Sequence, residues 1–257
     1  ELGQTRQTIR RHITELETIK GKKLFNTENR HYELTEDGHT ELASAETLLE
    51  RLESWLDKEY ELVEGLPRIH FDDSEGEFWA QRYPTMQIWN LAPPLIKKGL
   101  QSWAESECQL EHPKLKKIRP YLMVYRKNGP DWVCAEVGEK SSYSTWLGWK
   151  WAKSVVGTSF HRDPLSSQSD NFMIEAYDSV ARTGNVWYDH IYTSFSRPQN
   201  GKIQPVSYQR LVMALFFPDG SQAVASLVAR TNDIEIHGLK KCDLKLMSAE
   251  DVMDFHI

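Results

Sequence analysis

The chain has 257 residues, of which 40% are hydrophobic and 26% are charged, and its formal net charge is −6. This much apolar sequence can bury the core of one large domain or of two smaller ones, and no apolar run approaches the roughly 18 residues that a membrane span requires. The three cysteines are odd in number and far apart, without a C-x-x-C pair, which argues against a disulfide framework or a zinc ribbon and favours a reducing compartment.

The chain opens with a predicted amphipathic helix. Thr5 can cap this helix, and the apolar residues Ile9, Ile13 and Leu16 recur at three- and four-residue spacing. Basic and hydrogen-bonding side chains occupy the remaining faces: Arg6, Gln7, Arg10, Arg11 and Thr14. The pattern therefore predicts a helix with a dry apolar side and a front that can contact a polar partner.

Two short strands are predicted directly after this helix. Leu24-Phe25 and residues 31–34 flank a polar turn, so the pair reads as a small basic hairpin. Residues 1–34 hold seven Lys or Arg against five Asp or Glu, which makes this piece positive although the whole chain is negative. A helix followed by such a hairpin is typical of the end of a winged helix-turn-helix.

The order of residues in this stretch closely resembles the DNA-binding domain of LysR-type transcription regulators. The resemblance is carried by Ile13, Leu16, Glu17, Gly21, Lys23, Leu24, Phe25, Arg30, Leu34, Thr35, Glu36 and Gly38. A member of that family carries a first helix and most of a second one ahead of this stretch. We therefore expect residues 1–38 to hold a partial winged helix-turn-helix whose first helices are absent from the given sequence.

The resemblance implies that this unit binds double-stranded DNA. Arg and Gln side chains on a helix in the major groove can make bidentate contacts to guanine and adenine, whereas basic residues of the hairpin contact phosphates. The predicted DNA-binding residues are Thr5, Arg6, Gln7, Thr8, Arg10, Arg11, Thr14, Lys23, Arg30 and His31. The competing interpretation is a helix face that is merely solvated.

A proline-free helix is predicted next, over residues 39–60. Five residues spaced three, four, three and four apart form a possible coiled-coil seam: Leu42, Ala45, Leu49, Leu52 and Leu56. Periodicity alone fits an amphipathic helix packed on its own domain equally well. LysR-type regulators dimerise through a helix at this place, so the resemblance favours a homodimer and leaves open whether dimers pair into tetramers.

The remainder is predicted to be an acidic linker over residues 61–79 and an α+β domain over residues 80–257 that includes a C-terminal extension. The linker is inferred from Gly65-Leu66-Pro67 and the acidic run at 72–77. In the domain, a hairpin, a helical middle and three hairpin-connected strands follow one another: strands over 121–126 and 132–137, helices over 144–155 and 171–182, and strands over 186–195, 204–217 and 222–230.

This order of elements resembles a PAS domain. Short motifs support the resemblance: Trp146-Leu147-Gly148, Tyr177-Asp178-Ser179-Val180 and Phe217-Pro218-Asp219-Gly220. It implies a five-stranded antiparallel sheet with flanking helices and a role in sensing a small molecule. The usual LysR-type effector domain has two lobes in which strands and helices alternate, and this alternation is not found after residue 120.

Aromatic residues crowd the part of the chain between residues 146 and 192. Such a cluster is usually hydrophobic core, and the alternative is an apolar pocket that carries a polar anchor. The candidate ligand-binding residues are Cys134, Glu136, Trp146, Trp149, Phe172, Tyr177, Tyr188, Tyr192, Tyr208 and Arg210. No cofactor is evident, and the sequence does not identify the small-molecule effector.

The sequence as a whole predicts a homodimeric, sequence-specific transcription regulator that is cytoplasmic and associated with the nucleoid. No phosphate-binding loop, nucleophile elbow or His-Glu-x-x-His helix is present, so no enzyme activity is expected. Two alternatives remain open for the C-terminal domain. It could carry haem or flavin as a sensing cofactor, or it could act only as a protein-interaction module.

Overall fold

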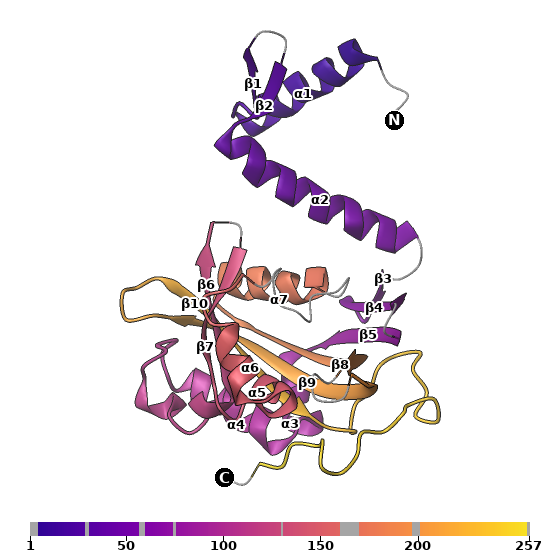
Figure 1. Cartoon of the computed structure of the whole chain (residues 1–257), viewed down its shortest axis with the longest axis vertical. Coiled ribbons are helices and arrows are strands. Elements are labelled where there is room, and N and C mark those ends of the chain that lie inside the picture. Colours follow the sequence, from indigo (N-terminus) through magenta and orange to yellow (C-terminus); the bar gives the residue numbers. More distant parts are fainter. Residues whose placement is uncertain are drawn as a thin grey trace. The chain divides into compact units, whose positions relative to one another are not determined.

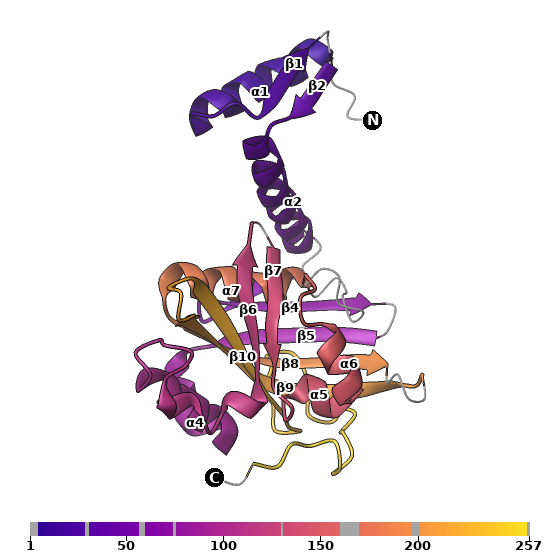
Figure 2. The same cartoon turned by 60° about the vertical axis from the view of Figure 1, so that its left-hand side comes forward.

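The computed structural model describes residues 5–28, 31–56, 60–73, 76–129, 131–159, 170–196 and 201–255. The chain divides into two units, Glu1–Leu56 and Asp57–Ile257, which are described separately (Figures 1 and 2). Within the described ranges, no helix combines the length and the apolar character that crossing a bilayer requires.

The N-terminal unit consists of two helices and a hairpin. Its elements are α1 (Arg6–Lys20), β1 (Phe25–Glu28), β2 (His31–Leu34) and α2 (Glu36–Leu56). Thr5 caps α1 as predicted, because its Oγ1 accepts a hydrogen bond of 3.2 Å from the Thr8 amide. The helix ends at Gly21, whose φ of +66° lies in the left-handed region that glycine adopts without strain.

Two expectations for this unit are corrected. The side of α1 that was predicted to be dry is open to water: Ile9 is 37% and Leu16 44% exposed, Ile13 is half-buried, and α1 buries none of its residues. The second helix was predicted to reach residue 60, but α2 ends at Leu56 and a strand begins at Tyr60.

The C-terminal unit is built on one antiparallel sheet of eight strands in the order β3-β4-β5-β8-β9-β10-β6-β7. Its strands are β3 (Tyr60–Val63), β4 (Leu66–Asp73), β5 (Gly76–Tyr83), β6 (Leu122–Asn128), β7 (Asp131–Val137), β8 (Val186–Ser196), β9 (Ile203–Phe216) and β10 (Gln222–Arg230). The predicted α+β class is confirmed, and the predicted number of five strands is wrong.

The three additional strands come from the segment that was predicted to be a linker. β4 pairs with β5, and β5 pairs with β8, so this segment extends the sheet. Phe71 and Phe78 lie opposite each other with ring centroids 5.0 Å apart, and both are buried. The acidic residues that suggested a linker, such as Asp72 and Glu77, lie at the turn end of the β4–β5 hairpin, where they are exposed.

Helices cover both faces of the sheet, as Figures 1 and 2 show. One face carries α5 (Ser142–Leu147), α6 (Trp149–Ser154) and α7 (Asp170–Thr183), and the other carries α3 (Ile88–Leu91), α4 (Pro94–Ala104) and the 3₁₀ turns Thr85–Gln87, Pro113–Leu115 and Arg119–Tyr121. Successive side chains of a strand point to opposite faces, so on β9 Val212 belongs to the core under α7, whereas Leu211 and Met213 belong to the core under α4.

After β10, residues 231–255 run along the sheet without forming a helix or a strand, and we call them the C-terminal segment. Ile234 and Ile236 are buried against Trp79 and Tyr192. The Met253 amide donates to the Arg230 carbonyl over 2.9 Å, which returns the chain to the end of β10. The segment therefore covers part of the sheet that helices leave open.

A fully buried ion pair lies in the middle of the sheet. Asp189 on β8 and Arg210 on β9 stand directly opposite each other, and both side chains are 0% exposed. Arg210 Nε donates to Asp189 Oδ1 over 3.0 Å, and Trp187 Nε1 donates to Asp189 Oδ2 over 2.7 Å. A slip of β9 by one residue would move the guanidinium to the other face, so the pair fixes the β8–β9 register.

We expect Arg210→Met to destabilise the C-terminal unit by about 3–5 kcal/mol, because it leaves Asp189 buried without a counter-charge. The double variant Asp189→Leu/Arg210→Met removes both charges and should recover most of this loss. Urea unfolding followed by tryptophan fluorescence measures both variants, since eight of the nine tryptophans lie in this unit. Equal destabilisation by the single and the double variant would contradict this prediction.

Candidate functional site

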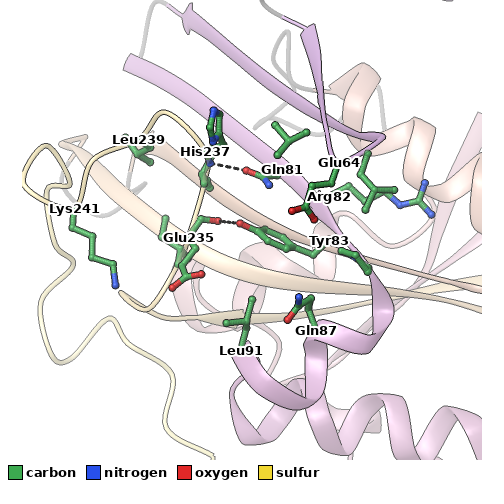
Figure 3. A pocket seen from close by; sticks show the side chains of 15 residues that line it. Glu64, Gln81, Arg82, Tyr83, Gln87, Leu91, Glu235, His237, Leu239 and Lys241 are labelled. Carbon is green, nitrogen blue, oxygen red and sulfur yellow. Dashed lines mark hydrogen bonds between the residues drawn. The ribbon is translucent and has the colours of Figure 1, made fainter.

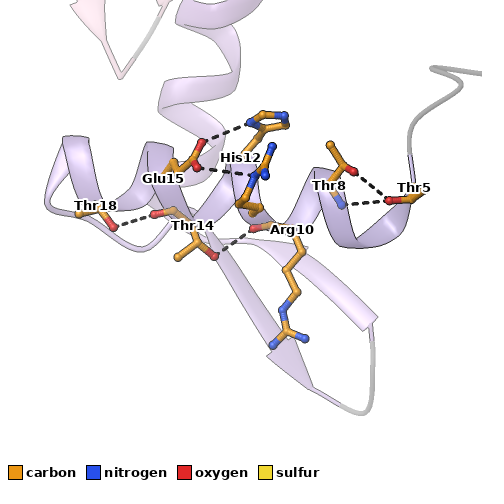
Figure 4. Close-up of polar contacts among 8 residues, drawn as sticks. Thr5, Thr8, Arg10, His12, Thr14, Glu15 and Thr18 are labelled. Carbon is orange, nitrogen blue, oxygen red and sulfur yellow. Dashed lines mark hydrogen bonds and ion pairs between the residues drawn. The ribbon is translucent and has the colours of Figure 1, made fainter.

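The exposed front of α1 is the first candidate site. Arg6, Arg10 and Thr14 follow one another at four-residue intervals, so they lie along one side of the helix, with Gln7 and Arg11 beside them. All five side chains are exposed. Figure 4 shows the Arg10 side chain extending away from the helix. This surface can present two guanidinium groups to an anionic partner.

Most other basic side chains of this unit are paired with acids. The ion pairs are Arg11–Glu15 at 3.7 Å, Lys20–Glu41 at 2.6 Å, Lys22–Asp37 at 2.7 Å and Lys23–Glu17 at 2.7 Å. Arg6 and Arg10 form no ion pair with any other residue that the structure describes. They are therefore the positive charges on α1 that remain available to a ligand.

Glu17 joins α1 to the hairpin. Its Oε1 accepts hydrogen bonds from the amides of Leu24 at 2.9 Å and Phe25 at 3.2 Å, and its Oε2 accepts one from Lys23 Nζ at 2.7 Å. The bonds from Lys23 and from the Leu24 amide lower the pKa of Glu17 below its ordinary value. One carboxylate thus holds the hairpin in a fixed position beside the end of α1.

The start of α2 is fixed at the same place. The Thr35 amide donates to the Leu24 carbonyl over 3.0 Å, and Thr35 Oγ1 donates to the Lys23 carbonyl over 2.7 Å. A Cβ at Gly38 would lie 2.1 Å from the Leu24 carbonyl oxygen, so no larger residue fits there. Glu17, Leu24, Thr35 and Gly38, which carry part of the sequence resemblance, are therefore the residues that build this junction.

Several predicted DNA-binding residues already have partners within the chain. The hydroxyl groups of Thr5 and Thr8 lie 2.9 Å apart at the helix cap, and Thr14 Oγ1 donates to the Arg10 carbonyl over 3.0 Å (Figure 4). Lys23 is held by Glu17. His31 begins β2, and Arg30 lies outside the described residues.

The predicted dimerisation residues form an exposed apolar stripe along α2. The stripe consists of Leu42, Ala45, Leu49, Leu52 and Leu56, all of which are exposed in the single chain. Leu48 lies beside it and is 65% exposed. An apolar stripe of this kind is stabilised when a partner removes it from water.

The predicted ligand-binding residues do not surround one pocket. Cys134, Trp146, Phe172, Tyr177, Tyr208 and Arg210 are buried on the face covered by α7, whereas Tyr188 and Tyr192 are buried on the opposite face. Trp149 is 42% exposed on α6, and Glu136 pairs with Arg119 near the surface. Strand alternation explains the division, because Tyr188 and Asp189 are neighbours that point to opposite faces.

The group under α7 is closely packed around Arg210. Its Nη1 lies 2.9 Å from the Met173 sulfur, and its guanidinium carbon lies 5.9 Å from the centre of the Phe172 ring. Burial raises the pKa values of Tyr177 and Tyr208 above the ordinary tyrosine value. Arg210, one of the predicted ligand-binding residues, is already paired with the Asp189 carboxylate.

A second buried polar group lies on the opposite face. The Glu235 amide donates to His190 Nδ1 over 3.0 Å, and His190 Nε2 lies 2.7 Å from the Tyr188 hydroxyl. Tyr188 donates to Gln209 Oε1 over 2.6 Å, and Gln209 Nε2 donates to the Asp233 carbonyl over 2.7 Å. These bonds connect β8 and β9 to the C-terminal segment.

Two surface pockets flank the sheet. One, of about 460 Å³, adjoins the His190 network and is lined among others by Glu64, Gln81, Tyr83, Gln87, Glu235 and Lys241 (Figure 3). The other, of about 670 Å³, surrounds Arg119, which donates to Glu136 Oε1 and to the Leu110 carbonyl, each over 2.6 Å. Of the ten predicted ligand-binding residues, Glu136 alone lines either pocket.

Sequence reasoning missed the His190 network and the smaller pocket. A signal was present for the network, because Tyr188, His190 and Gln209 interrupt long apolar strands at positions that share one face. The pocket was harder to predict from the sequence, because its walls come from a turn, a strand and an irregular segment that are far apart in the chain. Among the described residues, no group of three or more His, Cys, Asp or Glu side chains could hold a metal ion.

No protein-family model matches this chain, and no curated protein is detectably similar to it.

We expect the stability of the C-terminal unit to fall as the pH drops from about 6.5 to about 4. Burial lowers the pKa of His190 to about 4, so the folded state holds the neutral ring and unfolding takes up a proton in this range. Above pH 6.5 the ring is neutral in the folded and the unfolded state, so this effect costs no stability. Below about pH 4 the accumulated loss of unfolding free energy is on the order of 3 kcal/mol.

Urea unfolding between pH 4 and pH 8 checks this, with His190→Gln expected to remove that part of the pH dependence. The same substitution at the exposed His39 of the other unit is the control. An unchanged pH dependence in His190→Gln would show that other groups cause it.

Proposed function

We propose that this chain is a homodimeric, sequence-specific DNA-binding transcription regulator whose PAS-like C-terminal domain senses a small molecule. The observation that carries the proposal is the front of α1, where Arg6 and Arg10 are exposed and free of ion pairs with the rest of the described chain. The two guanidinium groups are available on α1, whereas the neighbouring basic side chains are paired with acids. Such a helix is suited to a partner that carries regularly spaced negative charges.

The proposed mode of binding places α1 in the major groove. Bidentate contacts from Arg6, Gln7 or Arg10 to base edges would each contribute about 1–3 kcal/mol of discrimination. The hairpin, held at a fixed position by Glu17, would contact the phosphate backbone and set the orientation of the helix. The exposed apolar side of α1 is where the LysR-type resemblance implies further helices.

The proposed dimer forms through the α2 stripe. Two DNA-binding units joined in this way read two half-sites together, so their weak individual affinities multiply through effective concentration. The exposure of Leu49, Leu52 and Leu56 supports this arrangement, because pairing would bury all three. A ligand that favours one arrangement of the paired units would then regulate DNA binding by a population shift.

The chain order of elements supports the PAS-like part of the proposal. A hairpin of β6 and β7, the helices α5 to α7 and a meander of β8, β9 and β10 follow one another as the resemblance implies, and β10 pairs with β6. One observation favours a second candidate, a domain used only for protein interaction: the interior under α7 is filled, and Arg210 is already paired with Asp189.

For DNA binding, we expect Arg10→Ala to weaken specific binding by roughly 1–3 kcal/mol while the dimer stays intact, since a base contact is lost without any change in packing. Gel shift measures the affinity and sedimentation measures the mass. Arg182→Ala, at an exposed arginine of the other unit, is the matched control and should leave both unchanged. Loss of the dimer in Arg10→Ala would show that the residue is structural.

For dimerisation, we expect Leu49→Asp to convert the dimer to a monomer, because a carboxylate cannot be buried in the apolar seam without a partner. Sedimentation equilibrium gives the mass directly. Thr40→Asp, on the same helix outside the stripe, introduces the same charge and should keep the dimer. An unchanged dimer mass in Leu49→Asp would refute the proposed seam.

A further inference from the structure

The pocket of about 460 Å³ lies on the face of the sheet opposite α7, and it shares no residue with the front of α1 or with the α2 stripe. Its walls come from the turn between β3 and β4, from β5 and from residues 234–241 of the C-terminal segment (Figure 3). Its volume suits a small molecule rather than a macromolecule. Any ligand bound here would touch the C-terminal segment and the sheet at the same time.

The walls of the pocket are held together by hydrogen bonds from β5. The Tyr83 hydroxyl donates to the Glu235 carbonyl over 2.6 Å, and Gln81 Oε1 accepts a bond of 2.6 Å from the His237 amide. Glu235 is also bonded to the buried His190 ring through its own amide. The pocket is therefore formed before a ligand arrives, which reduces the entropic cost of binding.

The charged groups of the pocket have a negative excess. The carboxylates of Glu64 and Glu235 lie on two sides of the Tyr83 ring in Figure 3, and Lys241 lies at the outer end. The Arg82 guanidinium contributes little here, because it points away and lies 4.0 Å above the Trp187 ring. Neither glutamate forms an ion pair with another residue in the described ranges.

The raised pKa of Tyr83 agrees with the excess of negative charge in the pocket. Burial, assisted by the charges of Glu235 and Glu64, raises the pKa of Tyr83 to about 12, so the phenol stays neutral at ordinary pH. A neutral aromatic face beside two carboxylates attracts a positive charge through its quadrupole and through the carboxylates together. Leu91, at the base of the pocket, offers an apolar surface for an alkyl chain.

We propose that this pocket binds a small organic ammonium ion, whose charged nitrogen lies on the Tyr83 ring between Glu64 and Glu235 and whose alkyl part packs against Leu91. The Gln87 side-chain amide supplies a further hydrogen-bonding group at the same wall. A carboxylate ligand would meet two like charges and one opposite charge, which disfavours it. This proposal goes beyond the proposed function and does not depend on DNA binding or on dimerisation.

The turn that carries Glu64 supplies a sharp test. Glu64 and Gly65 form a two-residue loop between the paired residues Val63 and Leu66, with φ angles of +53° and +79°. Turns with two positive φ angles favour Asn-Gly, and glutamate is strained in the first position. Glu64→Asn should therefore raise the melting temperature while it removes one of the two carboxylates.

Isothermal titration calorimetry on the full chain tests the proposal with n-butylammonium and 1,4-diaminobutane, using 1-butanol and butyrate as neutral and anionic counterparts. We expect the amines to bind, and Glu64→Asn and Glu235→Gln each to weaken their binding by about tenfold or more, as loss of a charge-assisted contact does. Glu139→Gln, at an exposed glutamate outside the pocket, is the control and should bind as the parent does.

Three outcomes would overturn the proposal. The amines and their counterparts could bind equally well, or no probe could bind at all. The amines could also bind equally to the parent, Glu64→Asn and Glu235→Gln, which would place the ammonium ion elsewhere. Because Glu64→Asn is expected to fold at least as stably as the parent, loss of binding in this variant cannot be attributed to unfolding.

Discussion

The salt bridge between Asp189 and Arg210 is the interaction on which the C-terminal unit depends. Two charges removed completely from water are tolerated only when each satisfies the other, so β8 and β9 can pair in one register alone. That register decides which side chains face α7 and which face the C-terminal segment. With this register, aromatic side chains of the sheet pack under α7, whereas Tyr188 and His190 lie on the other face, next to the open pocket.

A carboxylate has a comparable organising role in the N-terminal unit. Glu17 accepts two backbone amides and one lysine, and this combination fixes the hairpin against α1. The same unit pairs Lys20 and Lys22 with acids, so among the described residues of α1 the basic side chains without an ion pair are Arg6 and Arg10. In both units, a carboxylate that bonds within the chain fixes how neighbouring elements pack: Glu17 joins α1 to the hairpin, and Asp189 joins β8 to β9.

Local elements could be predicted from the sequence where apolar residues recurred at regular spacing or where capping and turn residues were present. The cap at Thr5, the hairpin, α2 and the meander β8–β10 are of this kind. The strands β3 to β5 were missed because acidic residues at their turn hid the alternation of Ile69, Phe71, Phe78 and Ala80. The candidate ligand-binding residues are divided between the two faces of the sheet for a different reason: neighbours in sequence were grouped together, whereas strand geometry sends them to opposite faces.

The pairing of β5 with β8 has a consequence for the assembly of the protein. These strands are far apart in the chain, and the hairpin β6–β7 with the helices α3 to α7 lies between them in sequence. Closing so long a loop costs conformational entropy before the contacts compensate for it. We therefore expect the attachment of the hairpins β3–β5 to β8 to form later in folding than the pairing of strands that are neighbours in sequence, such as β8 and β9.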